Sequence, residues 1–126
     1  MKTRLILCFT ILLALIGCKT TKFVLSAVEF AGKIQELQNA QIVDVRTPEE
    51  FVQKHLPNAV NIDVRDQFFD EQIKSLNKSN PVFVYCRSGK RSVFAAEKMR
   101  AQGFNVYELQ EGIQEWEAAK LPVKTE

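Results

Sequence analysis

Short apolar runs alternate with amphipathic stretches along most of this chain. Five runs rich in apolar and β-branched residues predict strands, at residues 23–25, 42–45, 59–62, 82–85 and 105–109. Capping residues and helical periodicity predict helices between and after them, at about 26–38, 47–54, 66–76, 91–102 and 112–120. Strands and helices that alternate at this spacing indicate parallel pairing. We therefore expect an α/β fold with a sheet covered on both faces.

The ends of several predicted helices are marked by residues that satisfy free backbone groups. Ser26–Glu29 and Thr47–Glu50 both have the spacing of a capping box. Pro48 occupies the first helical position of the second of these helices, where its missing N–H costs nothing. Gly103 supplies a C-terminal stop for the helix before it. The helix boundaries therefore rest on capping chemistry as well as on periodicity.

The first residues of the chain follow a different pattern. Lys2 and Arg4 precede an apolar run at 5–16, and together they have the charged and apolar regions of a secretory signal peptide. A helix that crosses a bilayer needs roughly 20 apolar residues. Polar residues at 19–22 end this run well before that length. We therefore expect export without a transmembrane helix.

The end of this apolar run carries a further signal. The tetrad LIGC at 15–18 resembles the lipobox of bacterial lipoproteins. The resemblance implies that residues 1–17 are a signal peptide, that Cys18 is lipidated, and that residues 18–22 tether a domain at 23–126. It also implies an exported protein, anchored by lipid to a bacterial membrane at its periplasmic or outer-membrane face. The alternative is an ordinary signal peptide with a chance cysteine near its cleavage site.

Composition changes the picture once the leader is set aside. The 126 residues suit one domain with a modest core. The formal charge of +2 falls to zero without Lys2 and Arg4, because every acidic residue follows Cys18. Nothing in this balance suggests nucleic acid. Of the three cysteines, Cys8 lies in the leader and Cys18 would carry lipid, so Cys86 is the only thiol of the mature chain and no intramolecular disulfide can form.

Cys86 stands between the fourth predicted strand and the start of a helix. In open α/β sheets, the crevice at the carboxyl ends of the strands binds ligands. Gly89 permits a tight turn, whose N–H groups form an anion cradle with those of the helix. Arg87, Lys90 and Arg91 add positive potential, which together with the helix dipole lowers the pKa of a thiol. We therefore expect a thiolate at neutral pH.

Two simpler interpretations of this stretch exist. A lone cysteine after a buried strand is most often a small hydrophobic residue. Three neighbouring basic residues can be a solvated surface cluster. A glycine-containing turn that opens a helix beside a thiol instead favours a nucleophile.

Three segments of the chain resemble the rhodaneses, a family of single-domain sulfurtransferases. The hexapeptide CRSGKR at 86–91 is similar to their active-site loop, residues 44–62 to their first signature, and residues 112–116 to their C-terminal Gly-x-x-x-Trp. The resemblance covers the chain from about residue 23 to its end. It implies a rhodanese-like fold with a five-stranded parallel sheet flanked by helices on both faces. The order of predicted elements indicates such a sheet independently.

The resemblance also implies a reaction. Cys86 would attack the outer sulfur of a small sulfur-containing anion such as thiosulfate, become a persulfide, and pass that sulfur to cyanide or a thiol. No metal or organic cofactor is implied. Asp44 and Arg46 would brace the loop by hydrogen bonds and ion pairing, and Glu50 would join them. The substrate would be bound by the residues that follow the cysteine, namely Arg87, Ser88, Gly89, Lys90, Arg91 and Ser92.

Loop length separates two chemistries within this superfamily. Rhodaneses have four residues between the cysteine and the last position of the loop, whereas the related cell-cycle phosphatases and arsenate reductases have five before their arginine. Four residues separate Cys86 from Arg91. This length favours sulfur transfer over a cysteine phosphatase. A third alternative is a non-catalytic rhodanese-like module that binds a protein or a small anion, although many such modules lack the cysteine that this chain keeps.

The chain departs from the family pattern at three positions. Lys54 replaces a glycine before the signature histidine, Asn58 replaces a glycine after the proline, and Glu111 replaces the first glycine of a common pair. Asparagine tolerates left-handed backbone geometry, so Asn58 is compatible with the turn. The resemblance assigns the only histidine, His55, to a structural turn instead of catalysis. We expect Trp116 to pack in the core.

Overall fold

The structure is a computed structural model that describes residues 22–125. The expected signal peptide, the lipobox and Cys18 lie outside the described residues. Five strands form one sheet in the order β1-β5-β4-β2-β3, and every neighbouring pair is parallel. The expected parallel sheet is thus confirmed, with β4 at its centre. The strands are β1 (Val24–Leu25), β2 (Gln41–Asp44), β3 (Val60–Asn61), β4 (Val82–Tyr85) and β5 (Val106–Leu109).

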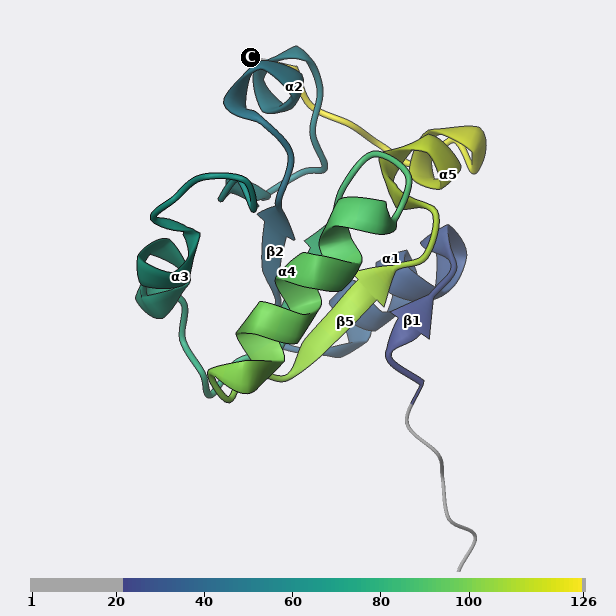
Figure 1. Cartoon of the computed structure of the whole chain (residues 1–126). Coiled ribbons are helices and arrows are strands. Elements are labelled where there is room, and N and C mark those ends of the chain that lie inside the picture. Colours follow the sequence, from purple (N-terminus) through teal and green to yellow (C-terminus); the bar gives the residue numbers. More distant parts are fainter. Residues whose placement is uncertain (1–21, 126) are drawn as a thin grey trace, which may run out of the picture.

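Helices cover both faces of this sheet. Figure 1 shows α4 in front of the sheet and α1 behind it, with α2 and α5 at the end where the strands finish. This arrangement is the α/β fold that the alternating elements predicted. The helices are α1 (Ala27–Glu36), α2 (Pro48–Gln53), α3 (Phe69–Gln72), α4 (Lys90–Ala101) and α5 (Gly112–Ala118), with a short 3₁₀ turn at Ile73–Ser75.

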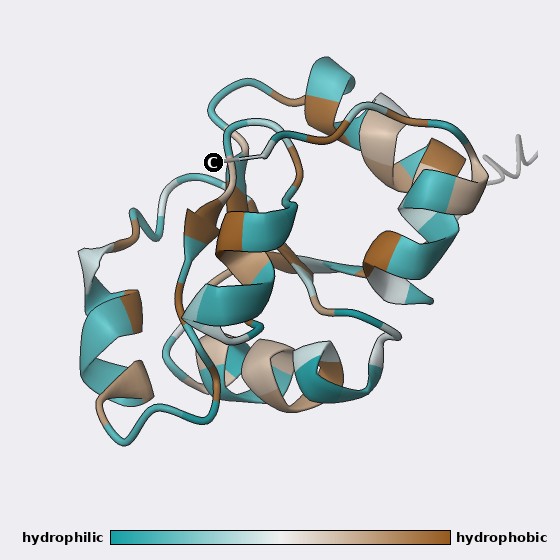
Figure 2. Cartoon of the chain, turned by 90° about the horizontal axis from the view of Figure 1, so that it is seen from above, coloured by the Kyte–Doolittle hydropathy of each residue, from teal (hydrophilic) through white to brown (hydrophobic). Residues whose placement is uncertain are grey.

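The central strand serves two cores, one on each face of the sheet. Successive side chains of a strand point to opposite faces, and all four residues of β4 are buried. On one face, Val84 lies in the same apolar cluster as Met99 of α4. On the other face, Phe83 packs with Phe30 of α1 and Trp116 of α5. Figure 2 shows the apolar residues gathered toward the strands and hydrophilic residues on the outer turns of the helices.

Several local predictions are confirmed by the backbone and side-chain geometry. Both capping boxes, at Ser26–Glu29 and Thr47–Glu50, have their two reciprocal hydrogen bonds. Asn58 has a φ of 64°, the left-handed conformation expected at that turn. Gly103 has a φ of 95°, and its N–H donates to the carbonyl of Arg100 at 2.9 Å. It ends α4 as predicted.

The helix expected at 66–76 is shorter than predicted. The N–H of Phe68 donates to Oδ1 of Asp66 at 2.7 Å, so a turn closed by a side chain precedes the helix. α3 begins only at Phe69 and soon tightens into the 3₁₀ turn. The apolar face is nevertheless buried as expected, because Phe69 and Ile73 are 2% and 0% exposed. Local hydrogen bonding by Asp66 therefore replaces the first helical turn.

The end of the described chain runs back from α5 to α2 (Figure 1). There His55 and Lys124 exchange two backbone hydrogen bonds, with N···O distances of 3.0 and 2.8 Å. The tail therefore ties α2 to α5 at the carboxyl ends of the strands. Across residues 22–125, no helix has the length and apolar character needed to cross a membrane.

Candidate active site

Cys86 lies directly after β4, at the carboxyl edge of the sheet. The turn that follows leads into α4 through Gly89, whose φ of 96° favours glycine. The N–H of Gly89 donates to Sγ of Cys86 at 3.1 Å. The same sulfur lies 3.7 Å from Oγ of Ser92 in the first turn of α4. The loop therefore closes around the sulfur atom.

The surroundings of Cys86 change its acidity in two opposite ways. The residue is 1% exposed, and this burial raises the pKa of the thiol. Hydrogen bonds from the backbone and hydroxyl of Ser92, and from the backbone of Gly89 and Ser88, outweigh burial, so that the pKa lies below its usual value. From the sequence, we expected N–H groups and basic side chains together to lower the pKa of this thiol. The hydrogen bonds of the loop are the leading stabilisers of the thiolate.

The carbonyl groups of the loop are held by α5. The N–H of Ile113 donates to the carbonyl of Cys86 at 2.9 Å, and that of Gln114 donates to the carbonyl of Arg87 at 3.3 Å. Gly112 makes this approach possible, because a Cβ at that position would collide with both carbonyls. Its φ of 67° also favours glycine. The carbonyls thus face α5, which leaves the N–H groups to face the sulfur.

The three basic residues of the loop have different surroundings. Arg91 binds Glu50 through Nη1–Oε1 and Nη2–Oε2 contacts of 2.7 and 3.0 Å. This ion pair lowers the pKa of Glu50 to about 2 and raises the pKa of Arg91. Arg87 and Lys90 are exposed. Arg91 therefore joins the loop to α2, and the other two cations face solvent.

Asp44 and Arg46 form a buried ion pair at the end of β2. The Nη2–Oδ2 distance is 2.6 Å, and the two side chains are 0% and 6% exposed, respectively. Arg46 also donates to the carbonyl of Lys54 at 2.6 Å, and its guanidinium lies 5.7 Å from the ring centre of Tyr85. The pair therefore contacts β4 and the end of α2. Glu50, in contrast, is joined to the residues that follow Cys86 by its ion pair with Arg91.

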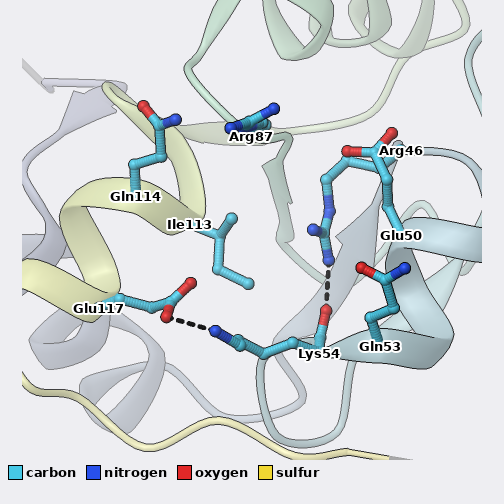
Figure 3. Close-up of a pocket in the computed structure, with 8 residues that line it drawn as sticks. All are labelled: Arg46, Glu50, Gln53, Lys54, Arg87, Ile113, Gln114 and Glu117. Atoms are coloured by element: carbon cyan, nitrogen blue, oxygen red, sulfur yellow. Dashed lines mark hydrogen bonds and ion pairs between the residues drawn. The ribbon is translucent and has the colours of Figure 1, made fainter.

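A pocket of about 370 Å³ lies beside the loop. This volume is within the range of small-molecule sites. Figure 3 shows one wall formed by α2 and the residue after it, an opposite wall formed by α5, and Arg87 at one end. An ion pair between Lys54 and Glu117 joins the two walls, with an Nζ–Oε2 distance of 2.7 Å. The lining residues are Arg46, Glu50, Gln53, Lys54, Arg87, Ile113, Gln114 and Glu117.

The structure does not bring all the predicted substrate-binding residues to one place. Gly89 and Ser92 contact the sulfur of Cys86. Arg87 lines the pocket beside the loop. Ser88 lines a second hollow of about 410 Å³. Gln114 of α5 borders both this hollow and the pocket beside the loop. Lys90 begins α4 and is exposed. Arg91 forms its ion pair with Glu50 of α2.

His55 and Trp116 have structural surroundings. The ring of His55 stacks on that of Phe51 at 4.0 Å between centroids, and its Nδ1 lies 3.0 Å from the Phe51 carbonyl. Trp116 is 5% exposed, and its Nε1 donates to the carbonyl of Pro122 at 2.8 Å. Neither residue lines the pocket beside the loop. In the part of the chain that the structure describes, no group of His, Cys, Asp and Glu side chains is arranged to hold a metal ion.

Sequence reasoning missed what α5 contributes to the site. Ile113 and Gln114 hold the loop through backbone N–H groups, which leave no mark in the sequence. The Gly-x-x-x-Trp pattern that begins at Gly112 pointed to this helix without revealing its contact. Lys54 was noted only as a departure from the family pattern, and nothing singled out Glu117.

Comparison with known proteins finds one family and several similar sulfur-handling proteins. Residues 26–119 match the family described as Rhodanese-like domain. The chain is 32% identical over 98 residues to the thiosulfate sulfurtransferase GlpE of Vibrio cholerae, with 77% of this chain and 91% of that protein covered. It is 30% identical over 92 residues to a sulfurtransferase of Allochromatium vinosum, with 72% and 84% covered. A Bacillus subtilis protein named as a sulfur carrier, YrkF, is 31% identical, but the chain spans only 49% of its length.

Solved structures have the same fold. A rhodanese-related protein from Thermoplasma volcanium superposes with a TM-score of 0.74 at 28% identity, with 83% of this chain and 100% of that chain covered. A rhodanese-like domain protein from Staphylococcus aureus superposes with a TM-score of 0.67 at 29% identity, with 75% and 91% covered.

Proposed function

The chain belongs to the rhodanese-like domain family, and from this premise we propose that it is a sulfurtransferase that carries sulfur on Cys86. The observation that supports this most is the position of Sγ inside a loop whose N–H groups lower the thiol pKa. A thiolate is the nucleophilic form of cysteine. The names of two relatives, thiosulfate sulfurtransferase and sulfurtransferase, support the same reaction class.

The proposed reaction has two steps. The Cys86 thiolate attacks the outer sulfur of a thiosulfate-like anion, a new S–S bond forms, and the donor's own S–S bond breaks. Sulfite leaves with the electron pair of the broken bond, and Cys86 becomes a persulfide. An acceptor, cyanide or a thiolate, then attacks the outer sulfur of that persulfide. Cys86 leaves as a thiolate, ready for another donor.

The loop supports both steps for the same physical reason. The thiolate and the persulfide are both anions, and the N–H groups of Ser88, Gly89 and Ser92 favour the charged form of the sulfur. Donors that are already in place need no reorganisation when charge moves onto the outer sulfur. The chemistry that we propose is carried by this chain's own thiol and backbone.

The proposal is tested by loading the protein with sulfur. Incubation with thiosulfate should add the mass of one sulfur atom to the wild type, as measured by mass spectrometry of the intact protein. Cys86→Ser should gain no mass and should lose the formation of thiocyanate from thiosulfate and cyanide. Sulfur that still loads onto the serine variant would refute the assignment of the nucleophile. A wild type that neither loads nor transfers sulfur would favour a binding module instead.

Loop length supports sulfur over phosphate chemistry. With four residues between Cys86 and Arg91, the ring of N–H groups should be too small for a tetrahedral phosphate centred over the sulfur. We therefore expect negligible hydrolysis of aryl phosphates. Brisk phosphatase activity that depends on Cys86 would assign the cysteine-phosphatase reaction.

We also propose that the protein is exported and anchored to a bacterial membrane through Cys18. The tetrad LIGC at 15–18 and the charged, apolar leader before it support this proposal. Attached acyl chains bind a bilayer by about 0.8 kcal/mol per buried methylene. The protein expressed in a bacterium should partition into detergent and incorporate labelled fatty acid, and Cys18→Ser should lose the label. Labelling that survives the substitution would contradict the lipid anchor.

A further inference from the structure

The described chain begins with a group of exposed apolar side chains. Phe23 and Val24 are 38% and 41% exposed, and Val28 in the first turn of α1 is 69% exposed. These three residues, which we call the β1 surface, are among the eight large apolar residues exposed within 22–125. Exposed apolar residues that are scattered singly are ordinary, whereas a group of them marks contact with another surface. The β1 surface is therefore a candidate contact site.

The β1 surface lies at one edge of the sheet. Within the sheet of the described residues, β1 pairs only with β5, and Figure 1 shows β1 at the right-hand side with β5 beside it. Leu25 is 5% exposed and packs in the core, but Val24 stays open to solvent. A second copy of the chain could pair with such an edge, but a strand of two residues offers few hydrogen bonds for it. The edge therefore suits contact through side chains better than pairing through backbone.

The length of the tether limits how far this surface can lie from a membrane. Phe23 follows Cys18, the proposed site of lipid attachment, by five positions. An extended chain spans at most about 3.6 Å per residue, so five residues reach at most about 18 Å. The proposed lipid on Cys18 would therefore hold the β1 surface, and not the opposite edge of the sheet, close to the bilayer.

The charges around the β1 surface balance one another. Three cations near it have carboxylate partners at 3.1, 3.9 and 3.0 Å, in the pairs Lys22–Glu29, Lys33–Glu36 and Arg100–Glu108. The guanidinium of Arg100 also lies 5.7 Å from the ring centre of Phe23. Long cationic side chains that lie along apolar groups suit a membrane–water interface. Because the charges are paired, burial of apolar side chains, and not attraction to anionic lipid, should drive contact with a bilayer.

We infer that the β1 surface rests on the bilayer that holds the lipid of Cys18, with its side chains at the boundary between headgroups and acyl chains. This inference goes beyond sulfur transfer and rests on the proposed lipid anchor. The sheet then stands on its β1 edge. Neighbouring strands lie about 4.8 Å apart, so β4 stands about 10 Å above β1, and β3 about 19 Å above it. The loop with Cys86 therefore opens to water beside the membrane.

Spin labels on the two edges of the sheet test this orientation. The full chain is expressed in a bacterium with Cys86→Ser, so that one introduced cysteine is the only free thiol of the lipidated protein. Val24→Cys or Val60→Cys then carries a nitroxide, and the protein is placed in vesicles of phosphatidylcholine. Val60 is the matched control, because it is a valine, 49% exposed, in the two-residue strand β3 at the other edge. Electron paramagnetic resonance measures collisions of each label with oxygen, which concentrates in bilayers, and with a nickel chelate, which stays in water.

The label at position 24 should collide often with oxygen and lose most collisions with the nickel chelate, also at high salt. The label at position 60 should collide freely with the nickel chelate. Adding Val28→Asp should return the first label to water, because a carboxylate in the β1 surface opposes contact with apolar lipid. Val93→Asp is the control, since Val93 is 45% exposed and, like Val28, lies in the first turn of a helix, where a carboxylate is tolerated. Both aspartate variants should still float with the vesicles, because Cys18 is unchanged.

Failure of this inference can be told apart from failure of the anchor. Protein that carries labelled fatty acid and floats with the vesicles, but whose label at position 24 meets the nickel chelate as readily as the label at position 60, overturns the membrane contact. A label at position 24 that meets neither reagent also overturns it, because a second copy of the chain would then cover the edge. Shielding that is lost at high salt overturns the apolar contact. A chain that incorporates no labelled fatty acid contradicts the proposed anchor itself, and this inference with it.

Discussion

Two turns at the carboxyl edge of the sheet share a dependence on glycine and little else. The turn after β4 holds Cys86 and Gly89, whereas the turn after β5 holds no cysteine. Their backbones nevertheless interlock. A Cβ on Gly89 would collide with the carbonyl of Gln110, and a Cβ on Gly112 would collide with the carbonyls of Cys86 and Arg87. The turn after β5 therefore shapes the turn that holds Cys86.

This difference shows how backbone N–H groups can be arranged around a thiolate. A peptide group carries its donor and its acceptor on opposite sides, and both need partners when they are buried. Loop N–H groups can face a sulfur only if the loop carbonyls find donors elsewhere. The N–H groups of Ile113 and Gln114 supply them. These groups belong to the first turn of α5, where N–H groups have no partner within the helix.

The largest effect should come from adding one methyl group to the supporting turn. Gly112→Ala places a Cβ against the carbonyls of Cys86 and Arg87 and strains a φ of 67°. The loop must move, and its N–H groups lose their alignment with the sulfur. Loss of one donor in an anion-binding loop costs about a hundredfold in rate. We expect sulfur loading by thiosulfate, measured in stopped-flow or quenched assays, to fall by at least about that factor.

Gly103→Ala is the matched control for this substitution. Gly103 also has a positive φ, of 95°, but a Cβ there meets no atom within 4 Å. It should lower the free energy of unfolding by about 1–2 kcal/mol through strain alone and leave the loading rate of the folded protein unchanged. Equal rates for the two alanine variants would show that the supporting turn does not shape the loop.

A smaller effect should follow from a change inside the loop's own hydrogen bonds. Ser92→Ala removes the hydroxyl that helps to lower the pKa of Cys86, so the pKa should rise. The hydroxyl has one proton, which the carbonyl of Gly89 accepts at 3.1 Å, and it must turn to the sulfur to stabilise the thiolate. Hydrogen bonds to charged groups are worth about 1.5–3 kcal/mol. We expect sulfur loading at neutral pH to slow by about tenfold.

The pH profile distinguishes this effect from a loss of packing. Loading should rise with pH through the thiol pKa and then level off, because the thiolate is the nucleophile. In Ser92→Ala the rise should move to higher pH, and the two proteins should approach the same rate in alkaline solution. A slower variant with an unmoved profile would assign Ser92 a packing role only. Thiolate absorbance in the ultraviolet, followed by titration, checks the same shift without turnover.

The smallest effect should come from the contact between the loop and α2. Glu50→Gln removes the ion pair with Arg91. The side chains of Glu50 and Arg91 are 30% and 18% exposed, respectively. The free energy of unfolding at neutral pH should fall by about 1 kcal/mol. The pKa of Glu50 is depressed to about 2 in the folded protein. Its contribution is therefore full above the unfolded pKa of about 4.3 and is lost as the pH falls toward about 2.

Denaturant unfolding at a series of pH values measures this contribution. The difference in stability between wild type and Glu50→Gln should be constant near neutral pH and shrink in acid. Glu71→Gln, which breaks an exposed pair with Lys74, should change stability by only a few tenths of a kcal/mol. A Glu50→Gln deficit that persists unchanged down to pH 3 would mean that the ion pair is not its cause.

Much of the architecture could be predicted because its causes are local. Capping boxes, the proline at the start of α2 and the glycine at the end of α4 depend on residues within a few positions of one another. The alternating elements are enough to indicate a parallel α/β sheet. The helix expected at 66–76 was too long because the Asp66 side chain competes for a backbone N–H, and periodicity does not register that competition.

By itself, the sequence determined the order of elements, the place of Cys86 after a central strand and the composition of its loop. The tertiary structure decided which groups lower the pKa of the thiol and which side chains enclose the neighbouring pocket. Residues 86–87 meet 113–114, and Lys54 meets Glu117, only after α5 packs against the carboxyl edge of the sheet. The first of these contacts is made by backbone groups that every residue type except proline carries. Such a contact has no signature in residue identity, so only the packing of distant segments reveals it.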